Sequence, residues 1–189
     1  MPMPALPSDL SRFSLVEIAQ MVADKKVPPV DSWHPPYRGH SHMRIKRDGR
    51  WFHEGGEITR ETMVRLFSSI LRREDDGSYC LVTPAERVTI DVDDVPFVAV
   101  EVMNTGAGQS RTLAFRLNTG DLVIAGAAHS LRFVSTDDGP SPYLMVRGGM
   151  EALITRPVFY ELAEIAIEEA NEPLGLWSDG HFCAMDGLL

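Results

Sequence analysis

The chain has 189 residues, 44% of them hydrophobic and 24% charged, and 27 acidic against 18 basic residues give a net charge of −9. This composition is typical of a globular protein and excludes collagen-like and disordered classes. No apolar run approaches the roughly 18 residues that a membrane span requires, and Met1–Pro7 lacks the pattern of a secretion signal. We therefore expect a cytoplasmic protein without a membrane span.

The charge is unevenly distributed. Residues 1–75 hold 12 basic and 10 acidic side chains, whereas residues 76–189 hold 6 and 17. So acidic a chain argues against long nucleic acid as a partner, because its binding depends on neutralised phosphates. A small anion at the first part of the chain is compatible with the pattern. Cys80 and Cys183 stand alone in the sequence, so we expect buried thiols and no disulfide.

The first elements are a short arm and a helix. Residues 1–13 contain three prolines and are expected to form a mobile arm. Ser14 and Glu17 have the spacing of a capping box, and apolar residues at helical spacing extend to about Lys25. Val27-Pro28-Pro29 then ends the helix.

A hairpin, a second helix and a strand follow. Met43–Glu54 reads as a β-hairpin with its turn at Asp48-Gly49. Thr59 is a suitable N-cap for a helix that ends near Glu74, with one apolar face. That face consists of Met63, Leu66, Phe67, Ile70 and Leu71. Tyr79–Thr83 has the pattern of a buried strand that stops at Pro84.

Beyond Pro84, short strands alternate with turn signals, and a last helix runs from Arg156 to about Ala170. Seven strands are predicted: Arg87–Val92, Phe97–Met103, Thr112–Leu117, Leu122–Ala125, Leu131–Val134, Tyr143–Val146 and Glu151–Ile154. Seven strands closed by a helix is the element order of a pleckstrin-homology-like (PH-like) barrel.

The predicted fold class is α+β, with two related β-plus-helix units. We divide the chain into an arm (1–13), an N-terminal helix and hairpin/helix unit (14–84), a C-terminal PH-like unit (85–171) and a docked tail (172–189). The evidence for relatedness is an internal repeat, because Ile58-Thr59-Arg60 recurs 96 positions later as Ile154-Thr155-Arg156 and each copy opens a predicted helix. An interface between two such units is a place where ligand pockets often form.

The segment from Arg44 to Arg60 is dense in polar and aromatic side chains. Strand alternation places Trp51 and His53 on one face, where a stacking ring and a hydrogen-bonding group would lie together, and Glu54 on the other. Arg60, at the start of the following helix, is suited to an anion. The structural alternative is that Gly55-Gly56 only forms a turn and Arg60 is a solvated side chain.

Two further segments contribute candidate ligand residues. Thr83 and Glu86 flank a strand end, where they can hydrogen-bond a sugar or an amine. Asp94 and Phe97 belong to a turn that either contacts the ligand or only caps a strand, with Phe97 filling the core.

Histidines suggest an alternative site. His40 and His42 share one face of a strand, and His53 on the adjacent strand would supply a third zinc ligand, although surface histidines are the simpler interpretation. No G-x-S-x-G, phosphate-binding G-x-x-x-x-G-K-[ST] or H-E-x-x-H motif is present. We therefore expect no cofactor, and a binding protein rather than an enzyme.

Four blocks in order resemble an uncharacterised bacterial domain-of-unknown-function family: DGRWFHEG (48–55), MVRLFSSILRRE (63–74), LVTPAE (81–86) and DDVPF (93–97). The resemblance covers about Trp33 to Ala170. It implies a duplicated core, a PH-like C-terminal half and a pocket at the junction of the halves for a nucleotide-like ligand in signalling. Gly39–His42 departs from the family pattern, which carries an acidic residue before the hairpin strand.

The leading hypothesis is a binding protein for a small anionic, nucleotide-like ligand. Its predicted ligand residues are Arg44, Trp51, His53, Glu54, Arg60, Thr83, Glu86, Asp94 and Phe97. The alternatives are a metal-dependent hydrolase that uses His40, His42 and His53, and a protein-interaction adaptor with Trp51 on a shallow surface. The C-terminal tail around Trp177 is apolar enough to dock on the body or to form a homo-oligomer contact.

Overall fold

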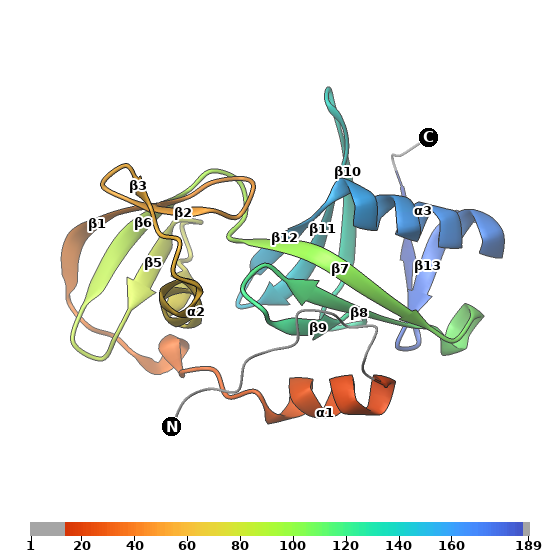
Figure 1. The fold of residues 1–189 in the computed structure, drawn as a ribbon, viewed down its shortest axis with the longest axis horizontal. Coiled ribbons are helices and arrows are strands. Elements are labelled where there is room, and N and C mark those ends of the chain that lie inside the picture. The colour runs from red at the N-terminus through yellow and green to blue at the C-terminus, as the bar shows by residue number, and fades with distance from the viewer. Residues whose placement is uncertain (1–13, 187–189) are drawn as a thin grey trace.

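The computed structural model describes residues 14–186, in which the chain forms two halves, each built on a six-stranded sheet (Figure 1). The expected arm, residues 1–13, lies outside the described residues. The first sheet has the strand order β3-β2-β1-β6-β5-β4. Its strands are β1 (Tyr37–Ile45), β2 (Trp51–His53), β3 (Gly56–Glu57), β4 (Leu71–Arg73), β5 (Tyr79–Val82) and β6 (Arg87–Val92).

The second sheet has the order β10-β11-β12-β7-β8-β9 and is followed by the long helix α3 (Arg156–Glu169). Its strands are β7 (Phe97–Thr105), β8 (Thr112–Leu117), β9 (Leu122–Ile124), β10 (Leu131–Thr136), β11 (Gly139–Arg147) and β12 (Met150–Ile154). A short 3-10 helix, η3 (Gly108–Ser110), connects β7 to β8. Helix α3 packs along this sheet at the upper right of Figure 1.

The two sheets have the same topology. In each, two three-stranded antiparallel meanders lie side by side, and the first strand of one runs parallel to the last strand of the other: β1 with β6, and β7 with β12. The expected duplication is therefore present as two related units. The equivalent strands β1 and β7 start at residues 37 and 97, so the structural offset is 60 residues rather than the predicted 96.

The predicted repeat was misaligned because the two helices occupy different places in the two units. Helix α2 (Glu61–Ser69) follows the third strand of the first unit, whereas α3 follows the sixth strand of the second. Ile58-Thr59-Arg60 and Ile154-Thr155-Arg156 are alike because both lead from a strand into a helix, and they are not topological equivalents.

The seven-stranded PH-like barrel is a second correction. Six of the seven predicted strands form the second sheet, but β6 pairs with β1 and β5 in the first. The second sheet also keeps β9 and β10 as its two edges, so within residues 14–186 it is an open sheet rather than a closed barrel. Strand count and spacing alone carried no information about which sheet β6 would join.

Helix α1 (Leu15–Asp24) begins as predicted. The Ser14 hydroxyl accepts a hydrogen bond from the Glu17 backbone N–H, and the Glu17 carboxylate accepts from the Ser14 N–H, which completes the capping box. Ile18 is the buried residue of this helix, and it packs with Ala114 and Leu122 of the second half. The chain then continues as the N-terminal strap, which we define as residues 25–32 and which ends in the 3-10 helix η2 (Val30–Ser32) at the first half.

Helix α2 differs from its prediction at both ends. Arg60, not Thr59, occupies the N-cap position, and its side chain makes no capping hydrogen bond. The helix ends at Ser69 because Leu71 begins β4 and pairs with Leu81 of β5. Leu71 is therefore a core residue of the sheet, while Leu66 of the predicted apolar face is 61% exposed.

One continuous core joins the halves. It extends from Ile45, Trp51 and Leu71 of the first unit to Phe97 and Phe115 of the second. The β1–β2 turn also reaches the second half, where the Gly49 carbonyl accepts a hydrogen bond from the Asn118 side chain at 3.1 Å. The two units are thus packed as one body.

The tail forms a two-stranded hairpin, β13 (Gly175–Ser178) and β14 (His181–Ala184). Leu176 and Met185 join the main core, and the Ser178 hydroxyl accepts from the Leu113 backbone N–H and donates to the Ala125 carbonyl. The tail therefore docks on the body of its own chain. Among residues 14–186, no helix has the length and apolar character needed to cross a membrane.

Candidate functional site

A cavity of about 200 Å³ lies where the N-terminal strap crosses the junction of the halves. The strap forms one wall with residues 27–31, which include Pro28, Pro29 and Asp31. The first half contributes Leu71–Arg73 from β4, and the second contributes Arg147, Gly148 and Met150 around the β11–β12 turn. We call this space the junction cavity, because strap and both sheets contribute to its lining.

Arg147 is the charged group of the junction cavity that has a buried donor atom without a partner among the described residues. Its Nη2 atom donates to the Ser68 carbonyl at 2.6 Å, and its guanidinium lies over the Phe97 ring at 5.2 Å from the centroid. Its Nη1 atom is buried and has no hydrogen-bond partner among the described residues. Burial lowers the pKa of Arg147, and the charges of Asp121 and Asp31 oppose that shift. A buried cationic donor without a partner is costly unless a ligand or water satisfies it.

The two other arginines of the cavity differ in how many hydrogen bonds they already make within the protein. Arg72 donates from Nη1 to the carbonyls of Val30 and Trp33 and pairs with Glu74, so it fastens the strap to β4. Arg73 is exposed and makes one long hydrogen bond, from Nη1 to the Gly149 carbonyl at 3.3 Å. Arg73 therefore has donors open to a ligand, and Arg147 has one donor, Nη1, that is unpaired but shielded from solvent.

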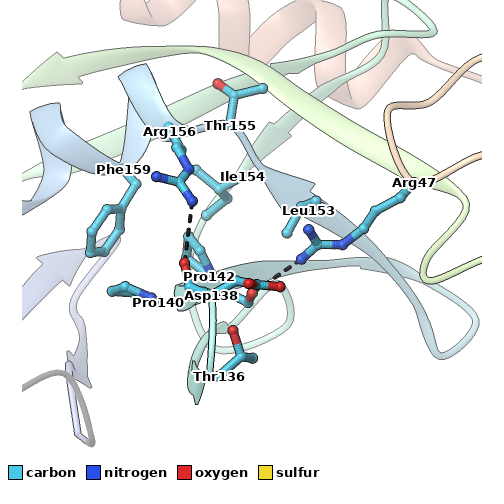
Figure 2. Close-up of a pocket in the computed structure, with 11 residues that line it drawn as sticks. Arg47, Thr136, Asp138, Pro140, Pro142, Leu153, Ile154, Thr155, Arg156 and Phe159 are labelled. Carbon is cyan, nitrogen blue, oxygen red and sulfur yellow. Dashed lines mark hydrogen bonds between the residues drawn. The ribbon is translucent and has the colours of Figure 1, made fainter.

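A second cavity, of about 110 Å³, lies between the β10–β11 hairpin, the end of β12 and the start of α3. Figure 2 shows Arg47 and Arg156 reaching into it from opposite sides. Arg156 donates to the Asp138 carbonyl at 3.3 Å, and Arg47 donates to Asp94 at 3.2 Å and to the Ser141 hydroxyl at 3.1 Å. Both guanidinium groups thus already have partners within the protein.

His40 and His42 line an open groove on the first sheet, together with Arg44, Glu54 and Asp91, whereas His53 is not part of its lining. His40 accepts a hydrogen bond at Nδ1 from the His42 backbone N–H, and its Nε2 faces Asp91 at 3.2 Å. Both ring nitrogens of His40 are therefore engaged. Within residues 14–186, no group of three or more His, Cys, Asp or Glu side chains is arranged to hold a metal ion, so the geometry gives no support to the metal-dependent hydrolase.

Comparison with known proteins relates both halves to one family. The model described as "Domain of unknown function (DUF1285), N-terminal domain" matches residues 28–95, and that described as "Protein of unknown function (DUF1285), C-terminal domain" matches residues 96–185. The crystal structure of a DUF1285 family protein from Silicibacter pomeroyi DSS-3 is 44% identical, with a TM-score of 0.79 over 90% of this chain and 93% of that one. The chain belongs to the DUF1285 family.

A second DUF1285 family protein of solved structure, from Shewanella baltica OS155, is 28% identical and has a TM-score of 0.52, covering 69% of this chain and 93% of that one. No curated protein matches the chain. The two DUF1285 domain models meet between residues 95 and 96, which is the gap between β6 and β7, so the family division coincides with the two sheets. Helix α1 precedes the matched region.

The DUF1285 fold places the predicted ligand residues in separate parts of the molecule. Trp51 is 1% exposed and stacks on Phe67, with ring centroids 6.4 Å apart and an interplanar angle of 19°. Trp51 is therefore a core residue. Its ring is not open for stacking on a ligand, and it does not form the shallow surface that the adaptor hypothesis requires. His53 lies exposed at the end of β2, opposite Met43 of β1.

Thr83 and Glu86 form a local turn. The Thr83 hydroxyl accepts hydrogen bonds from the backbone N–H groups of Ala85 and Glu86. Its role is therefore to stabilise the turn between β5 and β6. Glu86 and Arg60 are exposed and line none of the three spaces described above. Arg44 pairs with Asp93 at 3.1 Å, so its charge is partly compensated.

Two predicted residues do lie at the junction of the DUF1285 halves. Asp94 bonds to Arg47 and to the Tyr143 hydroxyl, and Phe97 is a fully buried core residue beneath Arg147. Sequence reasoning missed Arg147 itself. Its signal is a charged residue at the end of an apolar strand, directly before the turn glycines Gly148 and Gly149.

Proposed function

We propose that this DUF1285 protein binds a small anionic molecule in the junction cavity, with Arg147 as the principal contact and Arg73 as a second. The observation that carries the proposal is that Arg147 lines the junction cavity while its Nη1 atom, shielded from solvent, has no hydrogen-bond partner among the described residues, so a small shift of the guanidinium would present this donor to a ligand. A guanidinium matches carboxylate and phosphate groups with two parallel hydrogen bonds, so an oxyanion is the ligand group that this donor fits.

The surroundings of Arg147 support a role in binding. Phe97 lies under the guanidinium and Ser68 holds Nη2, so the plane of the group is fixed before a ligand arrives. A group held in this way loses little side-chain freedom when it binds. Phe97 thus contributes by orienting Arg147, which replaces the direct ligand contact expected from the sequence.

We include in the proposal the nucleotide-like ligand and the signalling role that the family resemblance implies. The junction cavity has walls from the strap, the first sheet and the second sheet, so an occupant would contact three parts of the chain at once. Occupancy would favour the arrangement in which these parts enclose the ligand, because a ligand stabilises the state that binds it better. In a signalling protein, a partner recognises one of the two arrangements, so the ligand would control how much of the protein the partner binds.

The direct test is calorimetric titration of the full chain with inorganic phosphate, acetate, AMP, GMP and cyclic AMP. We expect saturable binding of at least one of these anions, and Arg147→Met should weaken it by about 1.5–3 kcal/mol, the range for a hydrogen bond to a charged group. Arg156→Met is the matched control, since Arg156 lies in the second cavity and should leave the affinity unchanged.

Two outcomes would contradict the proposal. One is that none of the anions binds the wild-type protein. The other is that Arg147→Met binds as well as wild type while Arg156→Met does not, which would move the site to the second cavity. Circular dichroism of both variants checks that each keeps the fold.

A further inference from the structure

The strap forms a wall of the junction cavity and belongs to neither sheet. Residues 27–31 make this wall, while β4 of the first sheet and the β11–β12 turn of the second make the others. The two sheets share one continuous core, and a close-packed core resists deformation. A change in the size of the cavity would therefore come from the strap.

The strap is fastened at both ends, to a different half at each. Near its start, Lys25 pairs with Asp121 of the second half, and the preceding helix α1 is held on that half through Ile18. At its other end, Arg72 of the first half donates to two backbone carbonyls, at 2.8 and 2.9 Å. The strap therefore bridges the two halves across the cavity.

The middle of the strap has no such attachment. Within residues 14–186, residues 26–29 make no hydrogen bond to either sheet. Pro28 and Pro29 have no N–H to donate, and their carbonyls accept from Val30 and Ser32 of the strap itself. Because the ring of each proline also fixes its φ angle, this segment is stiff and would move as a unit about its two ends.

The cavity under the strap is small for a ligand site. Its volume of about 200 Å³ lies below the range of about 300–1,000 Å³ that is usual for ligand pockets. The Nη1 atom of Arg147 is also shielded from solvent. A ligand of nucleotide size would therefore reach this donor only after a wall has moved, and the wall with the fewest attachments is the strap.

We propose that the strap is a lid of the junction cavity, which lifts when Lys25 and α1 leave the second half and closes again over the ligand. The hinge is η2, which Arg72 keeps fastened to β4. The inference rests on the proposed function in that it describes how the same site is opened, but the motion belongs to the chain and is measurable in the ligand-free protein.

The first experiment measures opening without a ligand. Met150 lines the cavity and is 2% exposed, so the thiol of Met150→Cys reports when the cavity opens to N-ethylmaleimide. Burial raises the pKa of the native thiols Cys80 and Cys183, which therefore react slowly, and the wild-type chain gives their background rate. We expect Lys25→Met to speed alkylation about two- to fivefold, the range for loss of one ion pair near the surface. Lys26→Met is the matched control, because Lys26 is exposed and makes no ion pair within residues 14–186.

The second experiment measures ligand kinetics by stopped-flow mixing, with whichever of phosphate, acetate, AMP, GMP or cyclic AMP binds in calorimetry. The ion pair of Lys25 holds the lid over both the empty and the occupied cavity. Lys25→Met should therefore raise the association and dissociation rates by the same factor as alkylation, and leave Kd within about twofold of wild type. A residue that contacts the ligand directly would change Kd instead.

The outcomes separate the lid from the proposed function. If the reporter is alkylated at one rate with Lys25→Met, with Lys26→Met and without either, the lid is overturned, while an anion that binds through Arg147 still supports the site. If Lys25→Met alone speeds alkylation and none of the anions binds, the lid stands and the proposed function falls. Should Met150→Cys fail to fold, amide exchange within residues 15–27 of the two lysine variants decides, since equal exchange in both would overturn the lid.

Discussion

The Tyr143 hydroxyl donates to the carboxylate of Asp94, with distances of 3.0 and 3.2 Å to its two oxygens. The same carboxylate accepts from Arg47, whose Nη2 donates to Ser141. Tyr143 and Ser141 belong to β11 of the second sheet, while Arg47 lies in the β1–β2 turn of the first half. This polar cluster therefore fixes the first half against the second beside the segment that connects them.

Removing the Tyr143 hydroxyl should loosen that junction. We expect Tyr143→Phe to lower the free energy of unfolding by about 1 kcal/mol, since a partly buried carboxylate loses one of its donors. Urea unfolding followed by fluorescence measures the change. Tyr160→Phe is the control, because Tyr160 is 57% exposed and should tolerate the substitution; equal stability of both variants and wild type would show that the Tyr143 bond contributes nothing.

Gly49 allows the β1–β2 turn to approach the second half. Its φ is +87°, and a Cβ atom there would lie 2.5 Å from Asn118 Nδ2 and 2.9 Å from Val98 Cγ2. Gly55 has a similar φ of +83° but no atom within 4 Å of such a Cβ. We expect Gly55→Ala to show only backbone strain of about 1 kcal/mol, and Gly49→Ala to cost about 1–3 kcal/mol more, since the clash adds to the strain.

The comparison of these two glycine variants isolates the contact between the halves. Differential scanning calorimetry of both would give the difference in melting temperature directly. If Gly49→Ala and Gly55→Ala melt at the same temperature, the turn moves away from Asn118 without cost, and the halves are less tightly fitted than the packing indicates.

Local elements were predictable where the signal lies within a few residues. The capping box at Ser14 and Glu17, the hairpin turn at Asp48-Gly49 and the start of the last helix at Arg156 all rest on short-range hydrogen bonds or backbone preferences. The assignment of β6 was wrong because its partner β1 lies 50 residues earlier, as the pair Tyr37 and Arg87 shows. Such pairing leaves no local trace in one sequence.

The candidate site was less predictable for the same reason. The junction cavity unites Asp31, Arg73 and Arg147, which come from the strap, β4 and β11. None of the three belongs to a local sequence motif that predicts binding. Trp51 was predicted as a ligand residue because it is an aromatic residue in a polar segment, but it is a core residue. The sequence did predict that a cavity lies at the interface between the two units, because the internal duplication indicated that such an interface exists.

Glu169 predicts an acid-sensitive contribution to stability. Burial alone would raise its pKa, but hydrogen bonds from the Arg111 side chain and the Gly108 N–H, with the Arg111 charge, lower it below the ordinary 4.5. A carboxylate whose pKa is lower in the folded state stabilises the fold above its unfolded pKa, and this stabilisation is lost as the pH falls through the folded pKa.

Glu169→Gln removes this contribution. The variant should be less stable than wild type near neutral pH, and its stability should fall less than that of wild type when the pH is lowered from about 6 to about 3. Urea unfolding at a series of pH values measures both effects. Glu164→Gln, on the exposed side of the same helix, serves as the control and should follow the wild-type curve; parallel curves for all three proteins would contradict the prediction.

The attachment of α1 depends on Ile18. This residue is fully buried and packs with Ala114 and Leu122 in a small cluster separate from the main core, while Lys25 pairs with Asp121 at the start of the strap. Truncating a buried Ile to Ala lowers the free energy of global unfolding by about 2–5 kcal/mol when the residue belongs to the cooperative core. Met21 and Val22 are partly buried against the same cluster, but the cluster is small and separate from the main core. We therefore expect Ile18→Ala to release α1 locally rather than to destabilise the entire chain.

Limited proteolysis and hydrogen exchange distinguish these two results. We expect faster cleavage and faster amide exchange within residues 14–31 of Ile18→Ala, with the unfolding midpoint of the remainder close to that of wild type. Val16→Ala is the matched control, since Val16 is 78% exposed on the same helix. A lower global midpoint without local cleavage would instead make α1 an integral part of the second half. Because the strap forms one wall of the junction cavity, local release in Ile18→Ala should also weaken any anion bound there, whereas Val16→Ala should bind it as wild type does.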